Sequence, residues 1–100
     1  EILERNKAMT DAQEKARKEY LEILNHNGEI EFMYNKFFYH IEPDYDKEDI
    51  YNIWKFADKY EGRGEKIATC SPATSILEVK VFEGKSILEI EGDMTDCILR

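Results

Sequence analysis

The residues best suited to chemistry form an acidic run near the middle of the chain. Its five carboxylates are Glu42, Asp44, Asp46, Glu48 and Asp49. Hard cations such as Ca²⁺ prefer several oxygen ligands from one short loop, so the run is a candidate calcium site. The EF-hand spacing fails, because counting from Asp44 puts Asp49 where glycine is needed and Lys55 where the bidentate glutamate belongs. We therefore favour a solvated acidic loop and predict no metal site.

The two histidines, His26 and His40, are the only candidates for general acid–base catalysis near neutral pH. A hydrolytic histidine needs a nucleophile on one side and an orienting carboxylate on the other. The serines are explained by helix caps and turns, and the chain has no Gly-x-Ser-x-Gly turn. No phosphate-binding glycine loop is present either. We predict no catalytic residue, no cofactor and no enzymatic activity.

Aromatic residues exceed what one sheet face needs. Six of them lie between positions 32 and 45, namely Phe32, Tyr34, Phe37, Phe38, Tyr39 and Tyr45. Trp54 is interpreted as a core anchor; alternatively it forms a peptide-binding platform with Tyr51, Phe56 and Tyr60. The candidate partner-binding residues are Glu42, Asp44, Asp46, Tyr39 and Trp54.

An amphipathic helix must precede this central region, from about Ile2 to His26. Its apolar stripe recurs at helical spacing and consists of Met9, Ala12, Ala16, Tyr20, Ile23 and Leu24. Thr10 suits an N-cap, so the helix begins either near Ile2 or at Thr10, which would leave residues 1–9 as a frayed arm. Gly28 suits the left-handed conformation after a helix. The stripe covers the chain's own sheet or, alternatively, a partner helix or a second copy.

Residues 29–70 are typical of four successive β-strands. The predicted strands are 29–34, 37–42, 50–57 and 65–70, and the first alternates at period two, with Ile30, Phe32 and Tyr34 on one face. Asn35-Lys36 fits a two-residue turn, although lysine resists the positive φ that such a turn requires.

The remaining residues are predicted to be helical. Ser71 suits an N-cap and Pro72 the first position of a short helix that ends near Val79. Ser86 then caps a last helix through residues 87–90, which Gly92 interrupts before residues 97–99.

Together these elements predict a single α+β domain over residues 1–100. It comprises an N-terminal helix, a four-stranded antiparallel meander and one or two short C-terminal helices. Only the helices are available to cover the meander, so we expect them on one sheet face. The opposite face is then acidic and aromatic.

Charge narrows the classes of partner. The 22 acidic and 14 basic residues give a net charge of −8, whereas nucleic acids and anionic membranes both attract cationic surfaces. We therefore predict that the chain binds neither nucleic acid nor a membrane directly. No apolar run approaches the roughly 18 residues that cross a bilayer. Cys70 and Cys97 lack CxxC spacing and are interpreted as reduced, partly buried thiols in the cytoplasm, with a disulfide or a metal pair as the alternative.

Several segments resemble a loose group of short, uncharacterised α+β proteins from Gram-positive bacteria and their mobile elements. The resemblance covers residues 18–99 and rests on the first strand and turn (29–35), the aromatic return strand ending at Ile41, the Trp54 strand and the closing segment 84–90. It departs at Lys36, where glycine is expected. The resemblance implies a hairpin-plus-helix architecture and a cytoplasmic setting, and it brings no catalytic residues.

Two functional hypotheses follow. The first is a small acidic interaction or accessory module that docks a protein partner, or a second copy of itself, on the open sheet face. The second is an acidic inhibitor that mimics nucleic acid and blocks a basic cleft of a defence or nucleic-acid-binding protein. The second hypothesis requires carboxylates spaced along one surface like phosphates.

Overall fold

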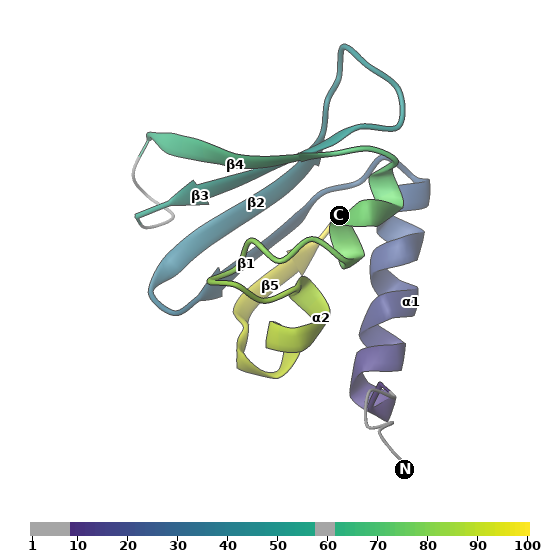
Figure 1. Cartoon of the computed structure of the whole chain (residues 1–100), viewed down its shortest axis with the longest axis vertical. Coiled ribbons are helices and arrows are strands. Elements are labelled where there is room, and N and C mark those ends of the chain that lie inside the picture. The colour runs from purple at the N-terminus through teal and green to yellow at the C-terminus, as the bar shows by residue number, and fades with distance from the viewer. Residues whose placement is uncertain (1–8, 58–61) are drawn as a thin grey trace.

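A computed structural model describes residues 9–57 and 62–100 (Figure 1). The elements in chain order are helix α1 (Asp11–Asn25), strands β1 (Ile30–Tyr34), β2 (Phe37–Pro43), β3 (Tyr51–Phe56) and β4 (Gly64–Cys70), the 3₁₀ helix η2 (Ala73–Leu77), helix α2 (Ile87–Ile90), the 3₁₀ helix η3 (Glu91–Asp93) and strand β5 (Thr95–Leu99). The predicted α+β class with an antiparallel sheet is confirmed, but the sheet has five strands where four were predicted. Among the described residues, none of the helices has the length and apolar character needed to cross a membrane.

Helix α1 begins directly after its N-cap residue, Thr10. The Oγ1 atom of Thr10 accepts a hydrogen bond from the backbone N–H of Gln13, and the Gln13 side chain accepts one from the backbone N–H of Thr10. This capping box satisfies two donors that would otherwise lack partners. Of the two predicted starts, the one at Thr10 is confirmed. Apart from Met9, the predicted frayed arm lies outside the described residues.

The end of α1 differs from the prediction. Asn27, with φ 55°, takes the left-handed conformation that was assigned to Gly28. Gly28 is required for space instead, because a Cβ atom there would lie 2.9 Å from both the carbonyl oxygen of Arg100 and the Cγ2 atom of Ile23. The glycine therefore lets the chain after α1 pass close to the end of β5.

The sheet has the strand order β4-β3-β2-β1-β5, with every neighbouring pair antiparallel. The predicted turn at Asn35 and Lys36 joins β1 to β2, and both residues have positive φ, 49° and 76°. This turn fixes the register that pairs Glu31 with His40, and the β2–β3 register pairs His40 with Trp54. The three side chains therefore share one sheet face.

Strand β5 was not predicted. The prediction placed residues 97–99 after an interruption of the last helix at Gly92, but residues 95–99 form a strand that pairs with β1, with Ile30 opposite Leu99. Helix α2 ends after about one turn, and the β-branched side chains of Thr95 and Ile98 suit a strand. The hydrogen bonds that stabilise β5 come from a strand far away in sequence, which local periodicity does not reveal.

The helix predicted over Pro72 to Val79 is also different. It is the shorter 3₁₀ helix η2, and its N-cap residue is Pro72, not Ser71. Neither residue caps it with a side chain; the backbone N–H of Ala73 donates instead to Oδ1 of Asp49, at 2.9 Å. The loop between β2 and β3 thus supplies the cap that Ser71 was expected to supply.

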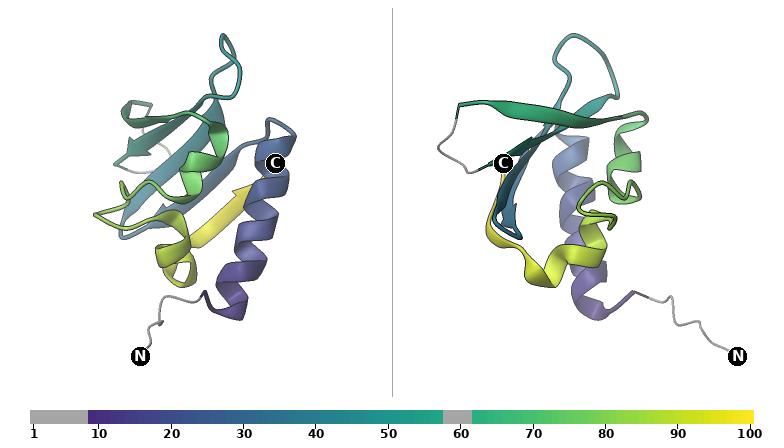
Figure 2. Two further views of the ribbon diagram at one scale, coloured as in Figure 1. Left: turned by 45° about the vertical axis from the view of Figure 1, so that its right-hand side comes forward. Right: turned by 60° about the vertical axis from the view of Figure 1, so that its left-hand side comes forward.

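The helices lie together on one face of the sheet, as predicted (Figure 2). The core beneath them is aromatic at its centre: the ring centroids of Phe32 and Tyr39 lie 5.3 Å apart, and the edge of Phe82 meets Tyr39 at 5.1 Å. In α1, the buried members of the stripe are Ala16, Tyr20 and Leu24, and they belong to this same core. The stripe therefore serves the chain's own sheet.

We predict that Lys36→Gly stabilises the fold. Lysine at φ 76° is strained by its Cβ atom, whereas glycine adopts this conformation freely. Lys36 is exposed, so the substitution removes no buried contact. The free energy of unfolding from urea titration should rise by about 1 kcal/mol.

Lys47→Gly is the matched control, because Lys47 is exposed and has no positive φ. It should leave stability unchanged or lower it slightly. If Lys36→Gly lost as much stability as the control, the strain attributed to Lys36 at positive φ would be refuted.

Candidate functional site

The face of the sheet opposite the helices, here called the outer face, is left uncovered by the described elements (Figure 2). Strand alternation and register place on it Glu29, Glu31, Met33, Phe38, His40, Glu42, Trp54, Phe56, Lys66 and Arg100. Most of these side chains are half-buried by one another rather than by a second layer. The outer face therefore combines charged, aromatic and aliphatic groups within reach of a partner.

Three carboxylates surround His40 on this face. The Nε2 atom of His40 lies 3.0 Å from Glu29, 3.6 Å from Glu31 and 3.9 Å from Glu42, each measured to the nearest carboxylate oxygen. We call Glu29, Glu31, Glu42 and His40 the carboxylate cluster. Ligand atoms of Glu29, Glu31 and His40 all lie within 4.8 Å of one another, a grouping close enough to hold a metal ion.

Two neighbours stabilise the ionised carboxylates. The hydroxyl of Tyr45 donates to Oε2 of Glu29 at 2.5 Å, and the guanidinium of Arg100 contacts both Glu29, at 3.2 Å, and Glu31. The Tyr45 hydrogen bond is the largest influence on the pKa of Glu29 and lowers it. Burial opposes this effect, His40 and Arg100 add smaller contributions that lower the pKa, and the net shift is downward. The same bond raises the pKa of Tyr45 to about 12.

An aromatic patch, formed by Phe38, Trp54 and Phe56, lies beside the cluster. The ring centroids of Phe38 and Phe56 are 5.6 Å apart, and the Nζ atom of Lys66 lies 5.7 Å from the Trp54 ring centroid. The Nε1 atom of Trp54 is buried yet has no hydrogen-bond partner among the described residues. Leaving such a donor unpaired costs about 1–3 kcal/mol.

This position corrects one interpretation of Trp54. Its side chain is half-buried on the outer face, so it is not an anchor of the main core. Of the platform residues proposed with it, Phe56 shares the outer face, Tyr51 is buried on the inner face, and Tyr60 lies outside the described residues.

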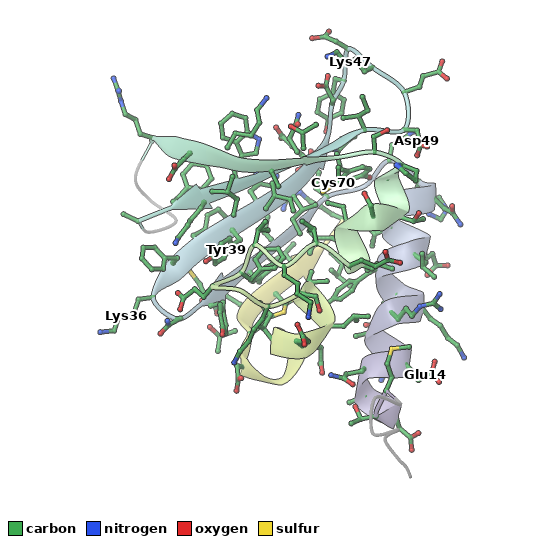
Figure 3. The ribbon with its side chains drawn as sticks, viewed as in Figure 1. Glu14, Lys36, Tyr39, Lys47, Asp49 and Cys70 are labelled. Carbon is green, nitrogen blue, oxygen red and sulfur yellow. The ribbon has the colours of Figure 1, made fainter. Side chains whose placement is uncertain are left out.

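The acidic loop uses its carboxylates for its own structure. Asp44 accepts hydrogen bonds from the backbone N–H of Asp46, at 3.0 Å, and from the side chain of Asn52, at 3.5 Å. Asp49 lies beside the start of η2, which it caps, while Lys47 is at the loop tip (Figure 3). The loop borders an open pocket of about 550 Å³. These bonds give Asp44 and Asp49 structural roles, whereas the sequence predicted a solvated acidic loop.

The structure separates the five predicted partner-binding residues. Glu42 and Trp54 both lie on the outer face, with Glu42 in the cluster. Asp44 and Asp46 belong to the loop instead. Tyr39 is wrong as a surface candidate, because it is fully buried in the core, at 0% exposure.

Sequence reasoning missed most of the carboxylate cluster. The signal was present in part: alternation from Glu29 to Glu31, followed by a two-residue turn at Asn35-Lys36, is enough to place Glu31 opposite His40. Arg100 had no such signal, because β5 was not expected to pair with β1.

The cysteine prediction holds in part. Both thiols are free, with Cys70 buried and Cys97 exposed rather than partly buried.

Comparison with known proteins gives no relative: no protein-family model, curated protein or solved structure matches the chain. The resemblance to short Gram-positive proteins stays a prediction.

We predict that Tyr45→Phe raises the pKa of Glu29, because it removes the hydrogen bond that lowers that pKa most. A depressed folded-state pKa gives stability that is present above the unfolded-state pKa and lost as the pH falls through the folded-state value. The variant should therefore lose less stability on acidification than the parent does. Carboxylate titration by NMR tests the first statement, and urea unfolding at several pH values tests the second. An unchanged Glu29 titration would refute the assignment.

We predict that Gly64→Ala disturbs the aromatic patch. A Cβ atom at position 64 would lie 2.5 Å from two ring atoms of Phe56, so the ring must leave its place over Gly64, which disturbs its packing against Phe38. The unfolding free energy should fall by about 1 kcal/mol, since overpacking outweighs the gain from a stiffer unfolded chain. In Gly92→Ala, where a Cβ atom meets nothing within 4 Å, no such loss is expected. Equal effects at both positions would contradict the contact.

Proposed function

We propose that this chain is a small docking module whose outer face binds a basic segment of a protein partner. The observation that carries the proposal is that the carboxylate cluster lies beside the half-buried aromatic patch. Both lie on a sheet face that the described elements leave uncovered.

The aromatic patch supports binding through its composition. Tryptophan is among the residues that contribute most to protein interfaces, and it does so from sites that a partner desolvates. Trp54 is half-buried on the outer face, so part of its side chain is open to a partner.

Charge indicates which partner fits. The guanidinium of Arg100 contacts two carboxylates of the cluster and demonstrates how an arginine is accommodated there. A second copy of the chain would instead bring its own carboxylates and its net charge of −8. Electrostatic complementarity therefore favours a basic partner over a homodimer.

The same geometry bears on the nucleic-acid mimic. A mimic needs acidic groups in a row that follows a phosphate backbone. The carboxylates of Glu29, Glu31 and Glu42 converge on one imidazole instead, which suits a single cationic side chain. We keep docking to a basic protein segment as the proposed role.

The proposed role is binding in the cytoplasm, not catalysis. His40 faces carboxylates, and the ring of His26 contacts the backbone carbonyl of Glu22 at 2.6 Å. Neither arrangement supplies a nucleophile. Two free thiols fit a reducing compartment.

A displayed library of random peptides provides the test. Peptides selected by the parent protein should be rich in arginine and lysine, with an aromatic or aliphatic anchor, and their affinity should fall with added salt. Trp54→Ala and Glu31→Gln should each weaken the binding of a labelled, selected peptide about tenfold, as measured by fluorescence anisotropy. Glu14→Gln, at an exposed position of α1, is the control and should leave peptide affinity unchanged.

Circular dichroism must show that each variant keeps the parent fold. Selection of acidic peptides, or affinities that Trp54→Ala and Glu31→Gln leave unchanged, would overturn the proposal. A concentration-dependent dimer that Trp54→Ala abolishes would also overturn it, because the occupant would then be a second copy.

A further inference from the structure

A metal-ligand geometry lies within the carboxylate cluster. The donor atoms are a carboxylate oxygen from Glu29, one from Glu31 and the Nε2 atom of His40, all within 4.8 Å of one another. Two of them lie on adjacent strands, because Glu31 on β1 and His40 on β2 are register partners, and Glu29 lies one residue before β1. Strand backbone therefore positions Glu31 and His40, and it positions side chains more rigidly than a loop does.

The spacing suits a small tetrahedral ion. Ligands about 2.0–2.1 Å from Zn²⁺ in tetrahedral arrangement lie about 3.4 Å from one another. From the His40 Nε2 atom, the observed separations are 3.0 Å to Glu29 and 3.6 Å to Glu31. Glu42, at 3.9 Å, is near enough to supply a fourth ligand after a small side-chain rotation.

The donor chemistry favours a transition metal over calcium. Imidazole nitrogen suits Zn²⁺ and its neighbours in the first row, whereas Ca²⁺ takes six or more oxygen ligands. The hydroxyl of Tyr45 also fixes the Glu29 carboxylate through Oε2, while Oε1 faces His40. Such outer hydrogen bonds to ligating carboxylates are usual at metal sites.

A cation already lies against two of the candidate ligands. The guanidinium of Arg100 contacts Glu29 and Glu31, whereas no contact joins it to Glu42. Arg100 contacts the same oxygens of Glu29 and Glu31 that face His40, so it competes with a metal ion for these ligands.

We propose that Glu29, Glu31 and His40, with Glu42 as the fourth ligand, bind one divalent transition-metal ion, Zn²⁺ by preference, in place of the guanidinium of Arg100. The ion and a basic partner side chain would then compete for the same carboxylates.

Trp54 makes the test direct. It is the only tryptophan of the chain and the register partner of His40, so its emission reports on this site. Titration of the untagged full chain with Co²⁺, which takes zinc sites and quenches nearby tryptophan, should quench the emission saturably. Zn²⁺ should reverse the quenching, and calorimetry with Zn²⁺ should give one ion per chain.

Substitutions distinguish this site from other side chains that could bind the metal ion. His40→Gln and Glu31→Gln should each weaken Zn²⁺ binding at least about tenfold. Arg100→Ala should strengthen it several-fold, because the competing cation is gone. Glu48→Gln in the acidic loop and Cys97→Ser at the exposed thiol are controls, expected within about twofold of the parent.

No saturable Zn²⁺ binding in the parent and in Arg100→Ala would overturn the proposal. A loss of binding in either control but not in His40→Gln would also overturn it. A failure of Zn²⁺ binding would leave the docking proposal standing, because that proposal is tested by the Trp54→Ala variant and by the composition of the selected peptides. Failure of peptide selection would likewise leave the metal titration unaffected.

Discussion

The fold depends on the placement of all covering elements on one side of the sheet. Phe32, Tyr39 and Phe82 pack ring against ring at 5.1–5.5 Å, and the helices close over them. Fully burying one such side chain contributes about 1.5–3 kcal/mol, so this aromatic centre is a major part of the driving force. Within residues 9–57 and 62–100, the helices all lie on this one side of the sheet. Among these residues the outer face is therefore stabilised by its own side chains.

That constraint explains the composition of the outer face. Without a covering layer, the half-buried aromatic rings of Phe38 and Phe56 pack against each other, and Glu29, Glu31 and Glu42 are held by His40, Tyr45 and Arg100. Each of these contacts is local to the sheet. They leave carboxylate oxygens and part of the Trp54 side chain exposed to an incoming ligand, which links the one-sided core to the proposed binding role.

Much of this arrangement follows from local patterns. Alternation in β1, the turn at Asn35-Lys36 and the cap at Thr10 are short-range features, and they predicted the meander and the start of α1 correctly. The features that were not predicted depend on contacts between residues far apart in the sequence. Strand β5 depends on pairing with β1, and η2 is capped by Asp49 rather than Ser71. Tyr39 was proposed for partner binding and Trp54 was interpreted as a core anchor, because strand alternation alone does not say which face the helices cover. Glu42 was identified, but the residues grouped with it were not: His40 lies on the same strand, Glu31 lies on β1 and Glu29 lies just before β1.

The most direct test of the central claim is hydroxyl-radical footprinting of the isolated chain, read residue by residue by mass spectrometry. A one-sided core predicts that Phe38, Trp54 and Phe56 are oxidised readily, while Phe32, Tyr39 and Phe82 are protected. If the two sets were protected alike, some element would cover the outer face, and the account of an open binding surface would be wrong.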